Sequence, residues 1–305
     1  MASLTPTVRK RKIQESFNDK FYYLTVNFIL LIIVIIVLYP LIYIVSSSFS
    51  SRTAILNGQV FLWPVGFTLE GYSLVFGYKY IGVGYINSLI YTTAGTVLNV
   101  FFTMVCAFPL SRKKLPYVKQ LMFLFTFTMF FGGGMIPNFM LIRSLGLIDT
   151  RMVMIIPGLI GVYNMIIART FIQNSIPEEL YEAARIDGCN NTEYFFRILL
   201  PLSKAVMAVL ALQYGVSHWN AYFNAYLYLN SKELYPLQIF LRQILVVNTI
   251  QANDFADSRM IEAMQGMAEL LKYALIVIGS VPVIVMYPFV QKHFIKGVMI
   301  GSVKG

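Results

Sequence analysis

The chain has 305 residues, of which 57% are hydrophobic and only 12% are charged, and its formal net charge is +10. Soluble domains carry roughly 25% charged residues, so this composition excludes an ordinary soluble protein and indicates a membrane protein. The basic residues are dispersed and accompany no nucleic-acid-binding motif. We therefore interpret them as topology determinants beside spanning helices and predict no nucleic-acid partner.

The first third of the chain predicts two spanning helices joined by an external loop. Residues 1–20 are polar and basic, as expected of a cytoplasmic N-terminal tail. The apolar run over about 22–44 is too long for the core of a signal peptide and predicts the first span. Residues 46–84 carry few charges and predict an external loop before a second span over about 86–110. A short basic loop on the inside then contains Arg112, Lys113, Lys114 and Lys119.

The middle of the chain predicts two further spans and a polar loop. A third span over about 121–141 contains three consecutive glycines and Pro137, which predicts that its outer half is bent or broken. A short external loop precedes the fourth span, over about 152–172. Residues 176–201 follow; they form the most charged segment between two long apolar runs and are expected in water at the membrane surface.

The last third predicts two more spans. The fifth covers about 201–222 and the sixth about 270–289, with residues 228–268 as an external segment between them. Pro236 favours a short helix in that segment, over about 237–246. The predicted fold is an all-α membrane protein in which residues 21–305 form six transmembrane helices. Lys and Arg are more frequent in the segments predicted inside, and this bias predicts that both termini lie in the cytoplasm. The membrane that the chain crosses would be the plasma membrane.

The charged loop predicts two short helices set at an angle. Ser175 and Glu178 fit a capping box at the start of the first helix, and Gly188 suits its end. Asn190 fits the start of the second helix, with Glu193 three residues further on. A short helix with small residues on one face and a charged flank is suited to docking in the groove of a partner.

The spans themselves carry almost no ionisable residues. Their central parts lack Asp, Glu, Lys and Arg, and only His218 approaches such a position. Pumps and ion-coupled carriers usually need ionisable groups there. The sequence also lacks a phosphate-binding glycine-rich loop followed by Lys-Ser or Lys-Thr, so we expect neither ATP hydrolysis nor another enzyme activity in this chain. Energy for uphill transport would have to come from another subunit.

Aromatic and amide side chains suggest a pathway for a sugar. Sugar rings present apolar faces and polar rims, which Trp or Tyr beside Asn can bind. The same aromatic residues also gather at membrane interfaces without binding anything, and this alternative stays open. The candidate substrate-pathway residues are Tyr163, Asn164, Trp219, Asn220 and Tyr222.

Two segments resemble a known family. The charged loop resembles the EAA loop of the membrane subunits of bacterial ABC importers, through Glu182-Ala183-Ala184, Asp187-Gly188, Phe195, Ile198 and Leu200-Pro201. The C-terminal tail resembles the signature of the carbohydrate-type permeases, through the segment Phe289 to Gly297, Gly301 and Lys304-Gly305. Together with the segment Phe131 to Pro137, these motifs are similar to the subgroup that serves complex oligosaccharides in Gram-positive bacteria.

The resemblance implies a function and a set of partners. The chain would have the type I ABC importer permease fold and form half of a translocation pathway for oligosaccharides. Its partners would be a homologous second permease in a heterodimer, two ATPase subunits that bind ATP and Mg, an extracellular sugar-binding lipoprotein and membrane lipid. The chain itself would hold no cofactor or metal.

The resemblance also assigns roles in the charged loop, which would be the coupling helix that docks on the ATPase. Glu182 would pair with a basic residue of the ATPase, and Ala183 and Ala184 would permit close approach. Asp187 and Gly188 would set the turn between the two helices. Phe195 completes the set of candidate coupling residues.

Three other classes of function remain as alternatives. A membrane-embedded enzyme would need a polar catalytic pair at membrane depth, and the sequence offers none. A channel or an ion-coupled carrier would work without an ATPase partner, and in a channel the docking loop has no purpose. A membrane scaffold would transport nothing. Binding of an ATPase distinguishes all three from the permease.

Overall fold

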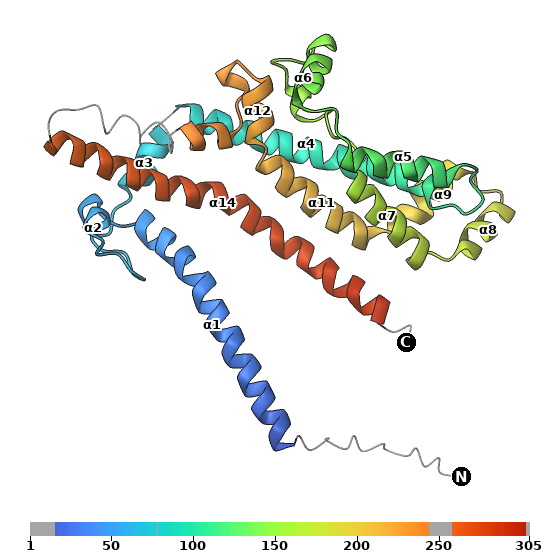
Figure 1. The fold of residues 1–305 in the computed structure, drawn as a ribbon, viewed down its shortest axis with the longest axis horizontal. Coiled ribbons are helices and arrows are strands. Elements are labelled where there is room, and N and C mark those ends of the chain that lie inside the picture. The colour runs from blue at the N-terminus through green and yellow to red at the C-terminus, as the bar shows by residue number, and fades with distance from the viewer. Residues whose placement is uncertain (1–15, 78, 244–257, 303–305) are drawn as a thin grey trace.

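The computed structural model describes residues 16–77, 79–243 and 258–302 (Figure 1). All regular secondary structure in these ranges is helical. Of the predicted N-terminal tail, residues 1–15 lie outside the described residues. Helix α1, Phe17–Ser48, begins at the end of that tail and includes the first predicted span. Its 32 residues exceed the roughly 20 that a membrane crossing requires.

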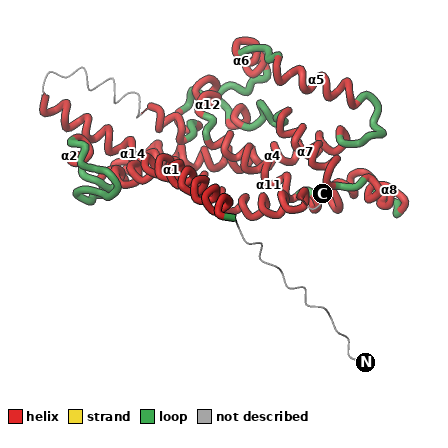
Figure 2. The backbone as a smooth tube through the Cα atoms, turned by 60° about the horizontal axis from the view of Figure 1, so that its bottom comes forward, coloured by secondary structure: helices red, strands yellow, loops and turns green. Residues whose placement is uncertain are grey.

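Helix α1 stands apart from most of the molecule in Figure 1, and Figure 2 shows it from another side as one long helix. It packs against α14, Ser258–Ser302, near its C-terminal end, while its apolar side chains are exposed along most of its length. A helix that is apolar all round requires an apolar environment on every side. The free surface of α1 is therefore suited to contact with lipid.

The predicted loop over 46–84 is more structured than its composition indicates. It contains α2, Arg52–Leu56, and α3, Glu70–Gly77, which both pack on α14. An ion pair between Arg52 and Glu70 joins the two short helices. Helix α4, Lys79–Leu110, then begins several residues before the predicted second span.

Helix α4 is the centre of the fold. It packs against α11, Lys204–Trp219, and α7, Val162–Ser175, and it contributes to three of the apolar clusters in the described core. Figure 1 shows α3 and α12, Tyr222–Tyr228, near the end where α4 begins, and α8, Glu178–Ile186, near the end where α4 finishes. The start of α12, which carries candidate residue Tyr222, thus lies toward one end of this long helix, and the charged loop lies toward the other.

The third predicted span is broken, as its glycines indicate. Helix α5, Val118–Phe130, and helix α6, Met135–Ser144, meet at an angle of 111°. The break contains the three glycines. Gly134 has a φ of +83°, which residues with a Cβ atom rarely adopt. The prediction of a bent or broken segment is confirmed.

The fourth predicted span is only partly helical. A 3₁₀ turn, Arg151–Met154, is followed by irregular backbone up to Gly161, and α7 begins only at Val162. Pro157 cannot donate a helix hydrogen bond, and Gly158 takes a φ of +84°. The expectation of one continuous helix over 152–172 is therefore wrong in its first half.

Side chains from neighbouring helices satisfy the backbone groups that this interruption leaves free. The Asn99 amide on α4 donates to the Gly158 carbonyl at 3.0 Å. The Gly161 N–H donates to the Tyr214 hydroxyl on α11 at 2.9 Å. Irregular backbone at membrane depth is tolerated when surrounding protein supplies such partners.

The chain between α7 and α11 forms several short elements. Helix α8 is followed by α9, Asn191–Tyr194, a π-helical turn over Phe195–Leu199, and α10, Leu200–Leu202. The backbone bends by 81° at Ser203 before α11 begins. Pro201, where the predicted fifth span begins, thus lies in α10, and the long helix of that span covers only Lys204–Trp219.

The last part of the chain follows the prediction with one change. A 3₁₀ turn, Lys232–Leu234, precedes a helix described over 237–243, which confirms the start predicted after Pro236; residues 244–246 of that prediction lie outside the described residues. Helix α14 begins at Ser258, inside the predicted external segment, and continues through the sixth predicted span.

Three described helical segments are long and apolar enough to cross a membrane: Phe17–Ser48, Tyr80–Leu110 and Gly266–Pro288. The number rises to five if each of the two bent pairs is one span. Each of the six predicted spans thus includes a helical segment. The third is broken, however, and the fourth is helical mainly in its second half, where α7, at 14 residues, is too short to qualify on its own.

Candidate functional site

Hydrogen bonds between residues close in sequence determine most of the turns in the loop over 176–201. Helix α8 begins after Pro177, and no side chain caps it. The predicted capping box of Ser175 and Glu178 is wrong, because Ser175 is the last residue of α7. The first turn of α8 instead carries two glutamates, and its last turn carries Arg185, an arrangement that complements the helix dipole.

Helix α8 ends in a Schellman motif, as the position of Gly188 predicts. Gly188 has a φ of +83°, and its N–H donates to the Arg185 carbonyl at 3.2 Å. The Cys189 N–H donates to the Ala184 carbonyl at 2.9 Å. These two bonds satisfy carbonyls that a helix end leaves free, and glycine enters the left-handed region at the lowest steric cost.

The second helix of the loop begins with the predicted cap. The Asn190 side-chain oxygen accepts from the Glu193 N–H at 2.9 Å, and the Glu193 carboxylate accepts from the Asn190 N–H at 3.1 Å. This reciprocal pair is a capping box. The direction in which the chain leaves α8 and enters α9 is therefore set by residues within the loop itself.

The candidate coupling residues divide between two faces of the loop. Ala184 is buried at 7% exposure and Phe195 is buried as well, in a cluster with Tyr194 and Leu199 that continues into α4 and α7. Glu182, Ala183, Asp187 and Gly188 are exposed. The small side chain of Ala184 thus allows close packing of α8 against its own chain, whereas Ala183 is exposed and adds little bulk to the outer surface of α8.

Ile186 is an exposed residue that the sequence reasoning did not single out. It lies at the end of α8 beside Asp187, and 86% of its surface is exposed. An isolated exposed apolar residue is common, but here it adjoins the open surface around Ala183. Its place directly before Asp187-Gly188 in the EAA-like motif was the available signal.

A basic segment after α4 forms two ion pairs with α8. The Lys114 ammonium lies 2.8 Å from a carboxylate oxygen of Glu182, and Lys113 lies 3.9 Å from Glu178. The Lys114 hydrogen bond lowers the pKa of Glu182, and that same bond raises the pKa of Lys114. The predicted pairing of Glu182 with an ATPase therefore competes with a partner in its own chain.

Arg112 ties the same segment to three aromatic rings. Its guanidinium carbon lies 3.9 Å from the ring centre of Tyr181, 4.8 Å from that of Phe108 and 5.1 Å from that of Tyr194. These rings come from α8, α4 and α9. Cation–π attraction is stronger where the cation is shielded from water. No motif in the sequence indicates this cluster, because its members lie far apart along the chain.

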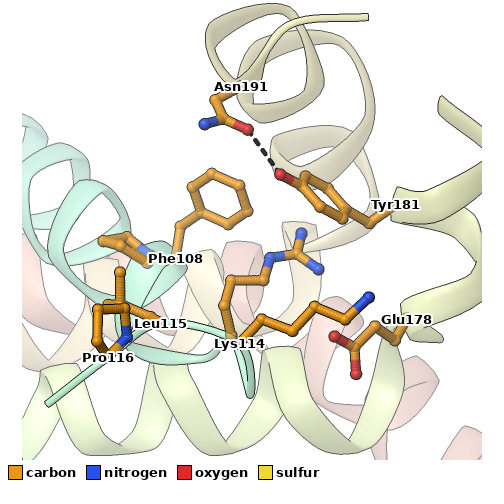
Figure 3. A pocket seen from close by; sticks show the side chains of 9 residues that line it. Phe108, Lys114, Leu115, Pro116, Glu178, Tyr181 and Asn191 are labelled. Atoms are coloured by element: carbon orange, nitrogen blue, oxygen red, sulfur yellow. Dashed lines mark hydrogen bonds between the residues drawn. The ribbon is translucent and has the colours of Figure 1, made fainter. Parts of the chain in front are cut away.

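The Arg112 cluster borders a pocket of about 300 Å³ (Figure 3). Within it, the Tyr181 hydroxyl donates to the Asn191 side-chain oxygen at 2.8 Å, joining α8 to α9. Figure 3 shows Tyr181 reaching toward Asn191, with Lys114 and Glu178 below. The pocket lies between the basic segment and the charged loop.

The C-terminal end of α4 is also bonded to α7. Arg169 donates to the Leu110 carbonyl at 2.8 Å, and the Gln173 amide donates to the Ser111 carbonyl at 3.2 Å. Carbonyls at a helix end need such partners. The loop, the end of α4 and α7 are thus linked by ion pairs, rings and hydrogen bonds.

The candidate substrate-pathway residues are not gathered in one place. Trp219 is buried at 2% exposure, donates its indole N–H to the Gly279 carbonyl at 2.8 Å and packs edge-on against Tyr85. This placement does not support contact between Trp219 and a substrate. Asn164 is also buried on α7, whereas its neighbour Tyr163 is 61% exposed.

Asn220 and Tyr222 do share a cavity. It has a volume of about 490 Å³ and lies between the start of α12, the helix over 237–243 and α14. Its lining comprises Asn220, Tyr222, Gln238, Leu241, Arg242, Ile276, Gly279 and Ser280. Among the described residues, no group of His, Cys, Asp and Glu side chains could hold a metal ion.

Comparison with known proteins identifies the family. Residues 81–300 match the family described as the inner membrane component of binding-protein-dependent transport systems. The chain belongs to this family. The match confirms the assignment drawn from the EAA-like loop and the C-terminal signature, and it places the chain in a membrane.

Individual relatives extend the match to nearly the whole chain. The polygalacturonan/rhamnogalacturonan transport system permease protein YtcP of Bacillus subtilis is 40% identical over 94% of this chain and 99% of the relative. Protein LplC of the same organism is 40% identical over 88% of this chain and 90% of the relative. Permeases of this family are transport subunits rather than enzymes.

A solved structure confirms the fold. The crystal structure of a bacterial ABC transporter involved in the import of the acidic polysaccharide alginate contains a chain that is 33% identical to this one, with a TM-score of 0.82. The similarity covers 93% of this chain and 100% of the other. The predicted all-α ABC importer permease fold is therefore confirmed.

Proposed function

We propose that this chain is the permease subunit of an ATP-driven importer of oligosaccharides and that residues 176–201 couple it to ATP hydrolysis in a partner chain. The observation that carries the proposal is the two-faced structure of the loop. One face, with Ala184 and Phe195, is packed into the chain. The other presents Ala183, Ile186 and Asp187 to a partner.

The attachment of the loop supports transmission of force. A partner that pushes on the exposed face of α8 would move the ion pair to Lys114 and the rings around Arg112. Lys114 and Arg112 belong to the segment that directly follows α4, the central helix of the fold. Movement of the loop would therefore reach the membrane-spanning part without a flexible connection in between.

The partners and the topology follow from this role. Two ATP-hydrolysing subunits would bind ATP and Mg, a second homologous permease would complete the pathway, and an external binding lipoprotein would deliver the sugar. The loop and both termini would lie in the cytoplasm. Relatives named for polygalacturonan, rhamnogalacturonan and alginate support a sugar polymer fragment as the substrate.

The first test is isolation of the tagged chain from its membrane in a gentle detergent, followed by identification of the bound proteins. Recovery of an ATPase and a second permease supports the proposal. Recovery of the chain alone, even after cross-linking, contradicts it and favours a channel or an ion-coupled carrier.

The second test addresses the exposed face of α8. Ile186→Glu should reduce substrate-stimulated ATP hydrolysis by the assembled complex, because it places a charge in a contact surface. Gln59→Glu adds the same charge at an exposed position near α2, away from the loop, and serves as the matched control. Equal activities of the two variants would contradict docking through this face.

A further inference from the structure

The cavity beside Tyr222 is open to the surface and has the size of a small-molecule site. Its volume of about 490 Å³ falls in the range of small-molecule sites. Segments far apart in the sequence meet there: the end of α11, the start of α12, the helix over 237–243 and α14. Its lining combines apolar Leu241 and Ile276 with the polar side chains of Asn220, Gln238, Arg242 and Ser280.

Arg242 supplies the positive charge in this cavity. Its guanidinium carbon lies 4.6 Å from the ring centre of Tyr222. The side chain is exposed, and among the described residues no carboxylate forms an ion pair with it. Stacking on a ring occupies the face of a guanidinium and leaves the in-plane N–H donors free. Those donors match the two oxygens of a carboxylate.

The neighbouring polar groups offer acceptors. Asn220 donates from its amide nitrogen to the Val216 carbonyl at 2.9 Å, which leaves its side-chain oxygen free to accept. Ser280 donates its hydroxyl to the Ile276 carbonyl at 2.7 Å and keeps its lone pairs. Free acceptors beside a cation suit a ligand that carries hydroxyl groups as well as a negative charge.

We infer that Arg242 binds the carboxylate of an acidic sugar, so that the imported oligosaccharide contains uronate residues. This inference rests on the proposed function of oligosaccharide import. Tyr222 holds the guanidinium in place, Asn220 and Ser280 accept hydrogen bonds from sugar hydroxyls, and Leu241 and Ile276 face the apolar side of the ring. Arg242 is thus a specificity-determining residue.

The test uses the complete transporter in proteoliposomes, with a short oligogalacturonate and its methyl ester as the two substrates. The ester removes the charge and keeps the hydroxyls. For Arg242→Gln we expect the KM for the acid to rise by about tenfold or more, because a charge-assisted bidentate contact is lost. The KM for the ester should not change. Arg242→Lys should retain part of the preference for the acid.

Each other outcome has a defined meaning. An unchanged KM for the acid in Arg242→Gln overturns the inference. An equal loss for acid and ester also overturns it and indicates that Arg242 contacts the binding protein or supports the fold. Transport of the ester but not of the acid by the wild-type complex overturns the inference and leaves the proposed function intact. If the wild-type complex transports neither, a short neutral galactooligosaccharide is offered next. Its transport overturns the inference and leaves the proposed function intact, whereas transport of no oligosaccharide contradicts the proposed function as well.

Discussion

The Lys114 ammonium and the Glu182 carboxylate lie 2.8 Å apart and join the segment after α4 to the middle of α8. The two residues are far apart in the sequence, and both side chains are mostly exposed. An exposed ion pair adds little to stability on its own. Its position between the central helix and the exposed loop makes it a test of how the two parts communicate.

Exchange of the two charges should separate the two roles possible for Glu182. If the pair with Lys114 is what matters, Glu182→Lys alone lowers substrate-stimulated ATP hydrolysis, and the double variant Lys114→Glu with Glu182→Lys restores most of it. If Glu182 serves a basic residue of the ATPase, the double variant stays as defective as the single one. The activity of the assembled complex decides between them, with Lys119→Glu as a control for the added charge.

The same pair predicts a dependence of stability on pH. The pKa of Glu182 is lowered by the Lys114 hydrogen bond, so its contribution exists above the usual glutamate value of about 4.3 and disappears as pH falls through the lowered pKa. The pKa of Lys114 is raised by that bond, so its contribution exists below about 10.4 and is lost as pH rises through the raised pKa.

The measurement is the thermal unfolding of wild type and Glu182→Gln in detergent at several pH values. We expect a small difference in Tm near neutral pH and convergence of the two proteins in strong acid and in strong alkali. A difference in Tm that is constant across the whole range would contradict the ion pair as its source.

The rings around Arg112 should stabilise the loop against the membrane-spanning part. Tyr181→Leu removes the ring nearest to the guanidinium and also the hydroxyl that bonds Asn191, and we expect it to cost about 1–3 kcal/mol. Tyr181→Phe keeps the ring and should cost about 1 kcal/mol or less. Thermal unfolding of the purified complex measures both. Equal losses would show that the hydroxyl, and not the stacking, is responsible.

Substitution of Gly188 should be limited by the backbone conformation at this position and not by steric clashes with neighbouring atoms. Nothing lies within 4 Å of where a Cβ would sit, yet its φ is +83°. Gly188→Ala should therefore destabilise the loop by about 1–2 kcal/mol, the cost of the left-handed region for a residue with a Cβ. Gly188→Asn should be milder, because Asn enters that region more readily.

The matched control for Gly188 is Gly82→Ala. It adds the same methyl group inside α4, also with nothing within 4 Å, but at a helical position where alanine is favoured. Protease sensitivity of the loop and thermal unfolding should respond to the change at Gly188 only. A stable Gly188→Ala variant would contradict the role of the Schellman motif.

The sequence predicted those features of the fold that depend on bonds between residues close in the chain. The cap formed by Asn190 and Glu193 and the turn at Gly188 depend on residues three to five apart, so the sequence shows them directly. The break between α5 and α6 is likewise visible in three consecutive glycines. The family and the all-helical fold follow from motifs and composition that do not depend on tertiary contacts.

Long-range contacts explain what the sequence did not show. The first half of the fourth predicted span is apolar enough for a helix, but its irregular backbone is possible only because Asn99 and Tyr214 lie beside it. Trp219 has the composition of a sugar-binding residue, but Tyr85 and the Gly279 carbonyl enclose it. The Arg112 cluster depends on three helices that meet only in the folded chain.

The interruption between Pro157 and Gly161 also limits how the molecule can change shape. Asn99 on α4 and Tyr214 on α11 each hold one backbone group that has no partner within its own helix. Sliding α7 by one turn past either neighbour would leave a polar group unpaired in an apolar environment, at a cost of several kcal/mol. Stepwise sliding of α7 along α4 or α11 is therefore disfavoured, and the bond from Trp219 on α11 to the Gly279 carbonyl on α14 restrains that neighbouring pair in the same way.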